Sequence, residues 1–472
     1  MGNPRKFTRV ARRLARSKPV IVVKSGQTTF GVPAGHTVRH SRLPREALDQ
    51  LLHQAGVIRV ENIHQLFDVA QLVVHQPLPS GPRVAVVTNS DALSALAADA
   101  CASWGLEVVH GPVAVPSEAT ATQFRAALTD AFGDEDVDSV VTGFMPPLVT
   151  LDRDVAAALA DVAAASEKTC VTTFLGMHGV TEVLSSSART VPAYPTPEDA
   201  VRALASASRY AAWRRRDRGA LVTIPGLLRD HARALVERLT PTDPDGVWLD
   251  QRTAADLLGA YGIELWPEFR VSSAEDAVAA AERAGYPVAL KATAYHLRHR
   301  ADLGAVRLDI ANEQELCDDL NEMTAALGSS GPSAFAVQAM APAGVACVVR
   351  STEDPLFGPV VEFGVGGPPT ELLGDVARRT PPLREGDVAD LVRSVGAAPL
   401  LFGHRGAEPV AIEALEDVVA RVALLADDLP EVGDLELNPV IASPRGAAVL
   451  GARVRLAPPP GRTDTDTRRL PG

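Results

Sequence analysis

Lysine is rare in this chain, and one lysine ends a run of apolar residues that is typical of a buried strand. The 472 residues include five lysines, of which Lys291 closes the run GYPVALK. An ammonium group at the end of a buried strand is costly to desolvate unless an anion lies beside it, and lysine binds phosphate as a compact point charge. The pattern predicts either a phosphate-binding lysine or a strand-end lysine that extends to solvent. For Lys24, in the similar run PVIVVK, we favour the second interpretation.

Two oxygen-bearing side chains stand on an apolar strand near the C-terminus. The segment GDLELNPV contains Glu436 and Asn438 at alternate positions, with Asp434 before them. Alternate residues of a strand point to the same face, so Glu436 and Asn438 can converge on one point. A carboxylate and an amide oxygen suit Mg²⁺, which completes its coordination with water and phosphate oxygens. The alternative is an edge-strand acid followed by a turn-forming Asn-Pro pair.

A third candidate segment is rich in glycine. The sequence FGPVVEFGVGGPPTELLGD places Gly358, Gly364, Gly366 and Gly367 around an apolar strand. Glycine allows the backbone to approach a bulky ligand without interference from a Cβ atom. Glycines also form simple hairpin turns, and that use is the more common one.

The composition limits the class of protein. At roughly 150 residues per domain, 472 residues predict about three domains, which excludes a small scaffold held by disulfides or metals. The 46 Lys and Arg residues against 58 Asp and Glu give a net charge of −12, which argues against a nucleic-acid-coating surface and against a polybasic membrane patch. Hydrophobic residues make up 46% and charged residues 22%, as in folded proteins rather than disordered chains.

The cysteines and the N-terminus give no sign of secretion. Cys101, Cys170, Cys317 and Cys347 are far apart and form no CxxC motif, so we expect buried thiols rather than disulfides or a zinc site. The basic N-terminus runs into no apolar stretch of signal-peptide length, and no segment reaches the roughly 18 apolar residues of a membrane span. We therefore expect a cytoplasmic protein.

Short apolar runs alternate with Ala- and Leu-rich amphipathic stretches in the N-terminal half. Such alternation predicts βαβ units and a mainly parallel sheet. We expect a partial domain over residues 1–80, a second domain over 81–216 and a linker over 217–245. The predicted elements are strands at Pro19–Lys24, Val57–Val60, Arg83–Thr88, Glu107–His110, Val137–Thr142 and Thr169–Phe174, and a helix from Thr196 or Pro197 to Trp213.

The C-terminal half predicts a different class of domain. Residues 246–458 read as an α+β domain, and the Pro-rich, charged residues 459–472 read as a disordered tail. At the other end of the chain, the strand-like PVIVVKSG follows a basic stretch with no earlier strand to pair beside, so we expect that the chain begins inside a domain. The predicted C-terminal elements are a helix over Asp250–Tyr261 closed by Gly262, a strand over Glu268–Val271, a helix capped by Ser272 or Ser273, and a strand over Pro287–Lys291.

Taken together, these segments resemble the NDP-forming acyl-CoA synthetases, the family of ADP-forming acetate-CoA ligases. The nucleotide-binding lobe of their ATP-grasp domain is similar to GYPVALKATAYHLRHRADLGAVRL, and the second lobe is similar to DPLFGPVVEFGVGGPPTELLGDVARRTPPL and DLELNPV. Their succinyl-CoA-ligase-like domains are similar to PVIVVKSGQ, HQAGVIRVENIHQLFDVAQLV, RVAVVTNS and VPAYPTPEDAVRALASASRYAAWRRR. The resemblance covers about residues 2–458. It implies flavodoxin-like, succinyl-CoA-ligase-type parallel-sheet domains followed by an α+β ATP-grasp domain.

The resemblance also implies a reaction. Members of this family move a phosphoryl group between an acyl phosphate and ADP through a phosphohistidine, and pass the acyl group to CoA. Imidazole suits the relay because its neutral nitrogen is nucleophilic near neutral pH. The phospho-acceptor matches His36 in AGHTVRH, and a relay histidine matches His299 in LRHRADLG. His40 and His296 are alternatives if the loops are shifted, and all four could instead be solvated loop residues.

Further roles follow from the same resemblance. Lys291 would meet a nucleotide phosphate of ATP or ADP, and Glu436 and Asn438 would hold Mg²⁺. The implied nucleotide-binding positions also include Gly304, Gly366, Gly367 and Arg379, with Glu371 nearby.

Several loops depart from the family pattern. Val38 and Arg39 replace the Gly-Ala that follows the phospho-acceptor. The phosphate-holding AGGPG loop is replaced by residues 90–94, which add the Asp91 carboxylate where an anion should lie. Ala305 replaces a glycine of the DxGGV turn, while Ala339 and Ala346 replace glutamates common near the nucleotide. Nucleotide binding survives these changes better than the phosphoryl relay does.

Two functions are compatible with this pattern. The first, which we favour, is the ATP-grasp part of an ADP-forming acyl-CoA ligase, acting on a carboxylic acid and CoA. Its CoA-binding domain would lie on a separate subunit or a missing segment, and the family usually forms oligomers. The second is a non-catalytic nucleotide- or CoA-sensing module of a GNAT-type protein acetyltransferase, which the altered loop at 90–94 favours. Neither function involves nucleic acid or a membrane, and the acyl group is not readable from the sequence.

Overall fold

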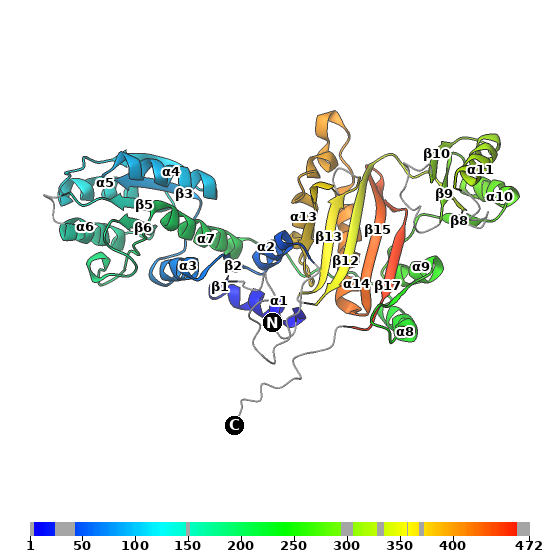
Figure 1. The fold of residues 1–472 in the computed structure, drawn as a ribbon, viewed down its shortest axis with the longest axis horizontal. Helices are drawn as coiled ribbons and strands as arrows, with labels where there is room; N and C mark the ends of the chain where they lie inside the picture. The colour runs from blue at the N-terminus through cyan, green and yellow to red at the C-terminus, as the bar shows by residue number, and fades with distance from the viewer. Residues whose placement is uncertain are drawn as a thin grey trace, which may run out of the picture. The chain divides into compact units, whose positions relative to one another are not determined.

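The computed structural model describes residues 4–23, 43–147, 152–293, 305–327, 335–355, 357–367 and 372–459. They form two compact units (Figure 1). The N-terminal unit consists mainly of residues 6–38 and 48–217, and the C-terminal unit mainly of residues 218–472.

A four-stranded parallel sheet in the order β4-β3-β5-β6 forms the centre of the N-terminal unit. Helices cover both of its faces: α4 and α7 pack through residues such as Cys101 and Leu204, and α5 and α6 pack through Phe124 and Leu159. Burial on both faces explains why β3, β5 and β6 consist mostly of apolar and small hydroxyl-bearing residues, whereas the edge strand β4 is largely exposed. The elements of this unit are α1 (Pro4–Ala15), β1 (Val20–Val23), α2 (Arg45–Gln54), β2 (Val57–Val60), α3 (Ile63–His75), β3 (Arg83–Thr88), α4 (Asp91–Trp104), β4 (Glu107–Ala114), α5 (Ala121–Gly133), β5 (Ser139–Phe144), α6 (Asp152–Ala164), β6 (Thr169–Phe174), the short 3₁₀ turn η1 (Glu182–Leu184) and α7 (Pro197–Arg215).

The region before residue 80 shares a core with the region after it. Strands β1 and β2 pair in parallel, with Val20 opposite Val57. Ile58 of β2 belongs to the same buried cluster as Val84 of β3 and Leu204 of α7. The described elements before and after residue 80, which were predicted to form two domains, therefore share one core.

The capping residues place two helices where the sequence predicts them. The Thr196 hydroxyl accepts a hydrogen bond from the Asp199 backbone N–H at 3.2 Å and begins α7. Of the two serines proposed to cap the helix after β8, Ser273 is the cap, and its hydroxyl accepts from the Asp276 N–H at 3.1 Å.

The C-terminal unit contains two antiparallel sheets. The small sheet has the order β10-β9-β11-β8, and helices α10 and α11 pack on one of its faces (Figure 1). The large sheet has the order β14-β13-β12-β15-β17-β7, with β16 paired to β15. Its elements and those of the small sheet are α8 (Arg229–Leu239), β7 (Val247–Trp248), α9 (Gln251–Gly259), β8 (Glu268–Val271), α10 (Ala274–Ala284), β9 (Val288–Ala292), β10 (Val306–Ile310), α11 (Glu313–Leu327), β11 (Phe335–Ala339), β12 (Val345–Asp354), β13 (Gly358–Val365), β14 (Ala377–Arg379), α13 (Glu385–Arg393), the 3₁₀ turns η5 (Ala398–Phe402) and η6 (His404–Gly406), α14 (Ile412–Asp428), β15 (Val432–Ser443), β16 (Gly446–Val449) and β17 (Ala452–Leu456).

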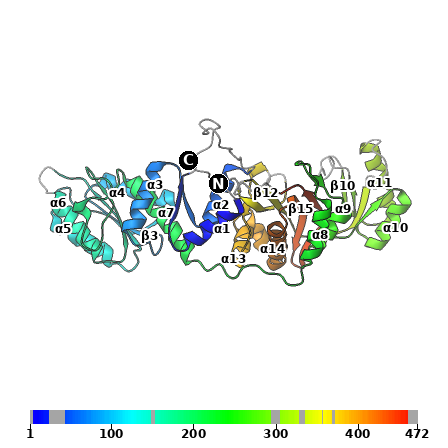
Figure 2. The ribbon, with the colours of Figure 1, turned by 90° about the horizontal axis from the view of Figure 1, so that it is seen from below.

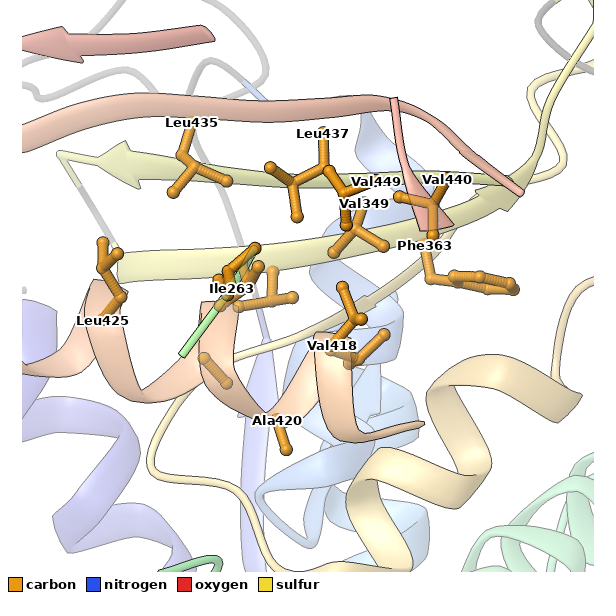
Figure 3. Packing of buried hydrophobic residues seen from close by; sticks show 14 of the residues in the cluster. Ile263, Val349, Phe363, Val418, Ala420, Leu425, Leu435, Leu437, Val440 and Val449 are labelled. Carbon is orange, nitrogen blue, oxygen red and sulfur yellow. The ribbon is translucent and has the colours of Figure 1, made fainter. Parts of the chain in front are cut away.

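One face of the large sheet is the main core of the C-terminal unit. Figure 3 shows Val418 and Leu425 of α14 packed against strand residues that include Leu435 and Leu437 of β15. Because alternate strand residues point to opposite faces, Glu436 and Asn438 lie on the other face of the sheet.

Two segments differ from the sequence expectation. Residues 217–245, predicted as a linker, contain helix α8, which lies near α14 in both ribbon views and buries Ala232 and Val236 in the core (Figures 1 and 2). Helix α9 ends at Gly259 rather than at Tyr261, because the Gly262 N–H donates to the Gly259 carbonyl at 2.8 Å and forms a tighter turn.

The described residues bear on two further expectations. No helix among them is both long enough and apolar enough to cross a bilayer. Cys101, Cys170 and Cys347 are buried thiols as predicted, whereas Cys317 is partly exposed. Burial raises the pKa of the Cys101 thiol to about 11 and the pKa of the Cys170 thiol to about 12.

Candidate functional site

A cleft of about 280 Å³ lies between the small and large sheets of the C-terminal unit. It contains three residues that the sequence singles out for chemistry, Lys291 from β9 and Glu436 and Asn438 from β15. Its lining also includes apolar side chains from both sheets, so the polar groups sit in a partly apolar surface. The other lining residues are Gln251, Glu268, Ala292, Thr293, Val306, Leu308, Pro439, Ile441, Leu450, Gly451, Ala452 and Arg453.

A buried glutamine on the next strand holds the Lys291 ammonium. Lys291 Nζ donates a hydrogen bond to Oε1 of Gln338, whose side chain lies in β11 and is 1% exposed. Gln338 Nε2 donates to the carbonyl oxygens of Trp266 at 3.1 Å and Leu450 at 3.3 Å. These two bonds fix the amide so that its oxygen faces the lysine. Because Gln338 is neutral, this contact orients the ammonium without neutralising its charge.

The Glu436 carboxylate collects two donors at one oxygen atom. Asn438 Nδ2 donates to Glu436 Oε1 at 3.0 Å, and a guanidinium nitrogen of Arg350 donates to the same oxygen at 3.2 Å. The two β15 side chains therefore converge as their spacing predicts. A carboxylate and an amide beside a lysine form a donor set that fits Mg²⁺ bound together with phosphate oxygens. Among the described residues, no three His, Cys, Asp or Glu side chains cluster as a metal site made of protein ligands alone.

Charged residues of alternating sign run across the large sheet through Glu436. In an antiparallel sheet, residues that lie opposite each other on neighbouring strands point to the same face. Across the five adjacent strands β14, β13, β12, β15 and β17, the residues opposite one another are Arg378, Glu362, Arg350, Glu436 and Arg453. We call these five residues the charge ladder. At one end, Arg378 Nε donates to Glu362 Oε1 at 2.5 Å. At the other, the Arg453 guanidinium stacks 4.0 Å from the ring centroid of Trp248. Sequence reasoning missed the ladder because strand register is not visible in local sequence.

A second polar pair lines the cleft wall near α9. Gln251, the first residue of α9, donates through Nε2 to Glu268 Oε1 at 2.8 Å. The apolar side chains of Val306 and Leu308 line the same cleft. The cleft thus offers hydrogen-bonding groups as well as a charged region.

Three of the predicted nucleotide-binding positions do not line this cleft. The Gly366 N–H donates to the Ala346 carbonyl at 2.7 Å, and Gly367 has a φ of +118°, a conformation that favours glycine. Arg379 lies opposite Val361, whose side chain belongs to the core face, and Arg379 donates to the Arg378 carbonyl at 2.8 Å. On β14 it is Arg378 that shares a face with Glu436.

Other residues named by the sequence analysis cannot be placed in the fold. His36, His40, His296, His299, Gly304, Glu371 and Lys24 lie outside the described residues, as do Val38, Arg39 and the tail from 460 onwards. Within the altered loop at 90–94, Ser90 is the residue before α4 and Asp91 is exposed in its first turn. A carboxylate there is stabilised by the positive end of the helix dipole and stands where an external anion would bind.

Comparison with known proteins agrees with this architecture. Residues 242–456 match the family model described as an ATP-grasp domain, and residues 1–73 match the succinyl-CoA ligase like flavodoxin domain. Acetate–CoA ligase [ADP-forming] I of Archaeoglobus fulgidus is 31% identical over 96% of this chain and 68% of the relative. For acetate–CoA ligase [ADP-forming] I of Pyrococcus furiosus, the β subunit is 36% identical over 43% of this chain and 89% of the subunit. Its α subunit is 24% identical over 44% of this chain and 50% of the subunit.

Part of the chain is also similar to a solved structure. The dinucleotide forming acetyl-coenzyme A synthetase 1 of Ca. Korarchaeum cryptofilum, in complex with coenzyme A, Ca-AMPCP and HgCl⁺, is 36% identical with a TM-score of 0.41. The match covers 44% of this chain and 93% of that one. On the strength of the sequence match along almost its whole length, the chain belongs to the family of ADP-forming acyl-CoA ligases.

Proposed function

We propose that this chain is the ATP-grasp part of an ADP-forming acyl-CoA ligase, which binds ATP or ADP with Mg²⁺ in the cleft of the C-terminal unit. The observation that carries the proposal is the convergence of Lys291, Glu436 and Asn438 on one cleft. A lysine that meets phosphate next to a carboxylate and an amide that hold a divalent cation is a set of groups suited to a nucleotide.

Each described residue has a physical task in this proposal. Lys291 binds the phosphates, and Gln338 keeps its ammonium pointed at them. Glu436 and Asn438 hold the Mg²⁺ ion, whose chemistry is to neutralise charge on the phosphate oxygens during transfer. The apolar side chains of Val306 and Leu308 pack against the uncharged part of the nucleotide.

The phosphoryl relay is proposed from motif position. His36 accepts the phosphoryl group from an acyl phosphate: a P–N bond forms at the imidazole as the P–O bond to the acyl group breaks. His299 takes the group from His36, as the P–N bond at His36 breaks and a P–N bond at His299 forms. ADP then takes the group from His299, as this second P–N bond breaks and a P–O bond to ADP forms. The reverse sequence uses ATP. Imidazole fits both steps because its neutral nitrogen is a nucleophile near neutral pH.

The proposal includes CoA and a carboxylic acid as substrates. The chain aligns with parts of both subunits of the Pyrococcus furiosus ligase, so the two kinds of region work together in that relative. We propose that a CoA-binding domain, on a separate subunit or elsewhere in the protein, completes the site at which the acyl group is transferred. The altered loop at 90–94 is the feature that favours the alternative, a regulatory module of a GNAT-type acetyltransferase, whereas the matched family models and relatives support the ligase.

The first test is nucleotide binding. Calorimetric titration with ADP in excess Mg²⁺ should show one saturable site, and Lys291→Ala should weaken binding by about tenfold to a hundredfold, since a charged hydrogen bond to phosphate is lost. Lys168→Ala is the matched control, because Lys168 lies in the N-terminal unit and donates to the Asp134 carbonyl. Absence of saturable binding to the wild type would rule out the proposed nucleotide site.

The second test is phosphoryl transfer. Incubation with Mg²⁺ and γ-labelled ATP should give an acid-labile, base-stable label on the wild type, and His36→Ala should abolish it. His299→Ala should slow the labelling. His231→Ala, which removes an exposed histidine paired with Asp256, should leave the label unchanged. Label that survives both His36→Ala and His40→Ala would exclude this loop as the acceptor.

A further inference from the structure

The Mg²⁺-binding carboxylate of the cleft already carries a cationic partner. Arg350 in β12 lies directly opposite Glu436 in β15 and donates to Glu436 Oε1 at 3.2 Å. The side chains are 37% exposed for Arg350 and 26% exposed for Glu436, so the pair is partly shielded from water. Charges that are partly shielded from solvent interact more strongly than fully exposed pairs.

The charge ladder explains why Arg350 meets Glu436. The register places Arg350 between two acids, Glu362 on β13 and Glu436 on β15. Glu362 has its own arginine, because Arg378 donates to it at 2.5 Å in a pair whose side chains are only 11% and 15% exposed. Of the two acids, Glu436 is the one that lines the cleft, and it accepts a hydrogen bond from Arg350 while Arg453 lies opposite it on the other side.

We propose that Arg350 occupies Glu436 in the absence of nucleotide and competes with the divalent cation for this carboxylate. This inference rests on the proposed function of the cleft. A guanidinium and a divalent cation that share one carboxylate repel each other, and each removes part of the charge that the other needs. The ion pair therefore lowers the divalent-cation affinity of the site, and Arg350 would release Glu436 when a divalent cation binds there with the nucleotide.

The same strand supplies a matched control pair. Asp434 stands two positions before Glu436 on the same face of β15, and it accepts a hydrogen bond from Arg455 Nε at 2.7 Å. Neither Asp434 nor Arg455 lines the cleft. Removal of Arg455 thus takes an arginine away from a neighbouring carboxylate without a change at Glu436.

The experiment measures how ADP binding depends on Mg²⁺. The full chain is titrated with ADP by calorimetry at a series of MgCl₂ concentrations, and the Mg²⁺ concentration that gives half-maximal binding is determined. Arg350→Met should lower this concentration by about tenfold, because the competing charge is gone while the side-chain volume stays similar. Arg350→Lys, which keeps a positive charge, should stay near the wild type, and Arg455→Met should not shift the midpoint.

The outcomes separate this inference from the proposed function. Arg350→Gln is a second neutral variant in case Arg350→Met does not fold, and thermal unfolding of each variant checks folding. An unchanged or higher Mg²⁺ midpoint in the folded neutral variant would overturn the competition while leaving the nucleotide site in place. A wild type that binds no ADP at saturating Mg²⁺ would overturn the proposed function and this inference together.

Discussion

Gln338 holds Lys291 from the neighbouring strand and is itself held by two backbone carbonyls. Its Oε1 accepts from Lys291 Nζ, and its Nε2 donates to Trp266 and Leu450. Because Trp266 precedes β8 and Leu450 precedes β17, this one amide ties the lysine-bearing small sheet to the large sheet. The direction of the ammonium is thus coupled to the packing of the two walls of the cleft.

Substitution of Gln338 should affect stability and nucleotide affinity together. Gln338→Leu leaves two partly buried carbonyl groups without their donor, which should lower the free energy of unfolding by about 1–3 kcal/mol. The Lys291 ammonium also loses its orienting acceptor, so ADP affinity should fall by about threefold to tenfold. Urea unfolding and ADP calorimetry measure the two effects.

Gln338→Glu distinguishes orientation from charge. A carboxylate at this position would pair with Lys291 and reduce its charge towards phosphate, so ADP affinity should fall further than in Gln338→Leu. Tighter ADP binding by Gln338→Glu than by the wild type would contradict a phosphate-binding role for Lys291.

The buried ion pair of the charge ladder should show strong coupling. Arg378→Met takes the guanidinium from the largely buried Glu362 carboxylate, which keeps only Arg350 opposite it, and should destabilise the chain by about 3 kcal/mol. The double variant Arg378→Met with Glu362→Met should recover most of this loss, since no isolated charge remains. A double-mutant cycle by urea unfolding gives the coupling energy, and additive effects of the two single variants would refute the pairing.

Asp138 should give the N-terminal unit an acid-sensitive component of stability. Burial raises the pKa of this carboxyl, but hydrogen bonds from the Arg83 guanidinium, the Arg83 N–H and the Ser80 hydroxyl outweigh burial and hold the pKa below its usual value. A pKa that is depressed in the folded state adds stability above the unfolded-state pKa, and this stability is lost as the pH falls through the folded-state pKa.

The loss should therefore begin below about pH 4, near the ordinary pKa of an aspartate. Asp138→Asn should be less stable than the wild type at pH 7, and the difference between the two should shrink as the pH falls to 3. Urea unfolding of both proteins across this pH range measures the difference in their free energies of unfolding. A difference that stays constant with pH would show that the Asp138 charge does not cause the loss of stability in acid.

Gly56 should tolerate no side chain. It has a φ of +73°, and a Cβ at this position would overlap the indole ring of Trp213. Gly56→Ala should therefore combine left-handed backbone strain with overpacking and destabilise the chain by about 2–4 kcal/mol. Gly105→Ala is the matched control, because Gly105 has a similar φ of +75° but open space around it, so only about 1 kcal/mol should be lost. Thermal unfolding compares the two, and equal losses would exclude the contact with Trp213 as the cause.

The local sequence pattern was sufficient to predict individual helices and strands and the pairing of residues that are close in the sequence. The strands Val57–Val60, Arg83–Thr88 and Thr169–Phe174 are confirmed as predicted, because apolar runs bounded by turn residues carry their own signal. The ends of β5 and α9 differ by about two residues from the prediction, since a helix or strand ends where its packing and turn geometry allow.

The sequence by itself determined which residues could do chemistry here. The rarity of lysine singled out Lys291, and the two-residue period of a strand placed Glu436 and Asn438 on one face. Both are properties of short segments. The motif order along the chain also identified the family to which the comparisons assign it.

Only the tertiary structure decided what each of these residues faces. Strand register places Gln338 beside Lys291 and Arg350 beside Glu436. Register also decides that Arg378, rather than Arg379, shares a face with Glu436. Register is set by the packing of side chains that are far apart in the chain, and a shift of one residue would turn every side chain to the opposite face. The residues that could do chemistry in the cleft could therefore be predicted from the sequence. The side chains that contact them, Gln338 and Arg350, are placed there by the folded sheets.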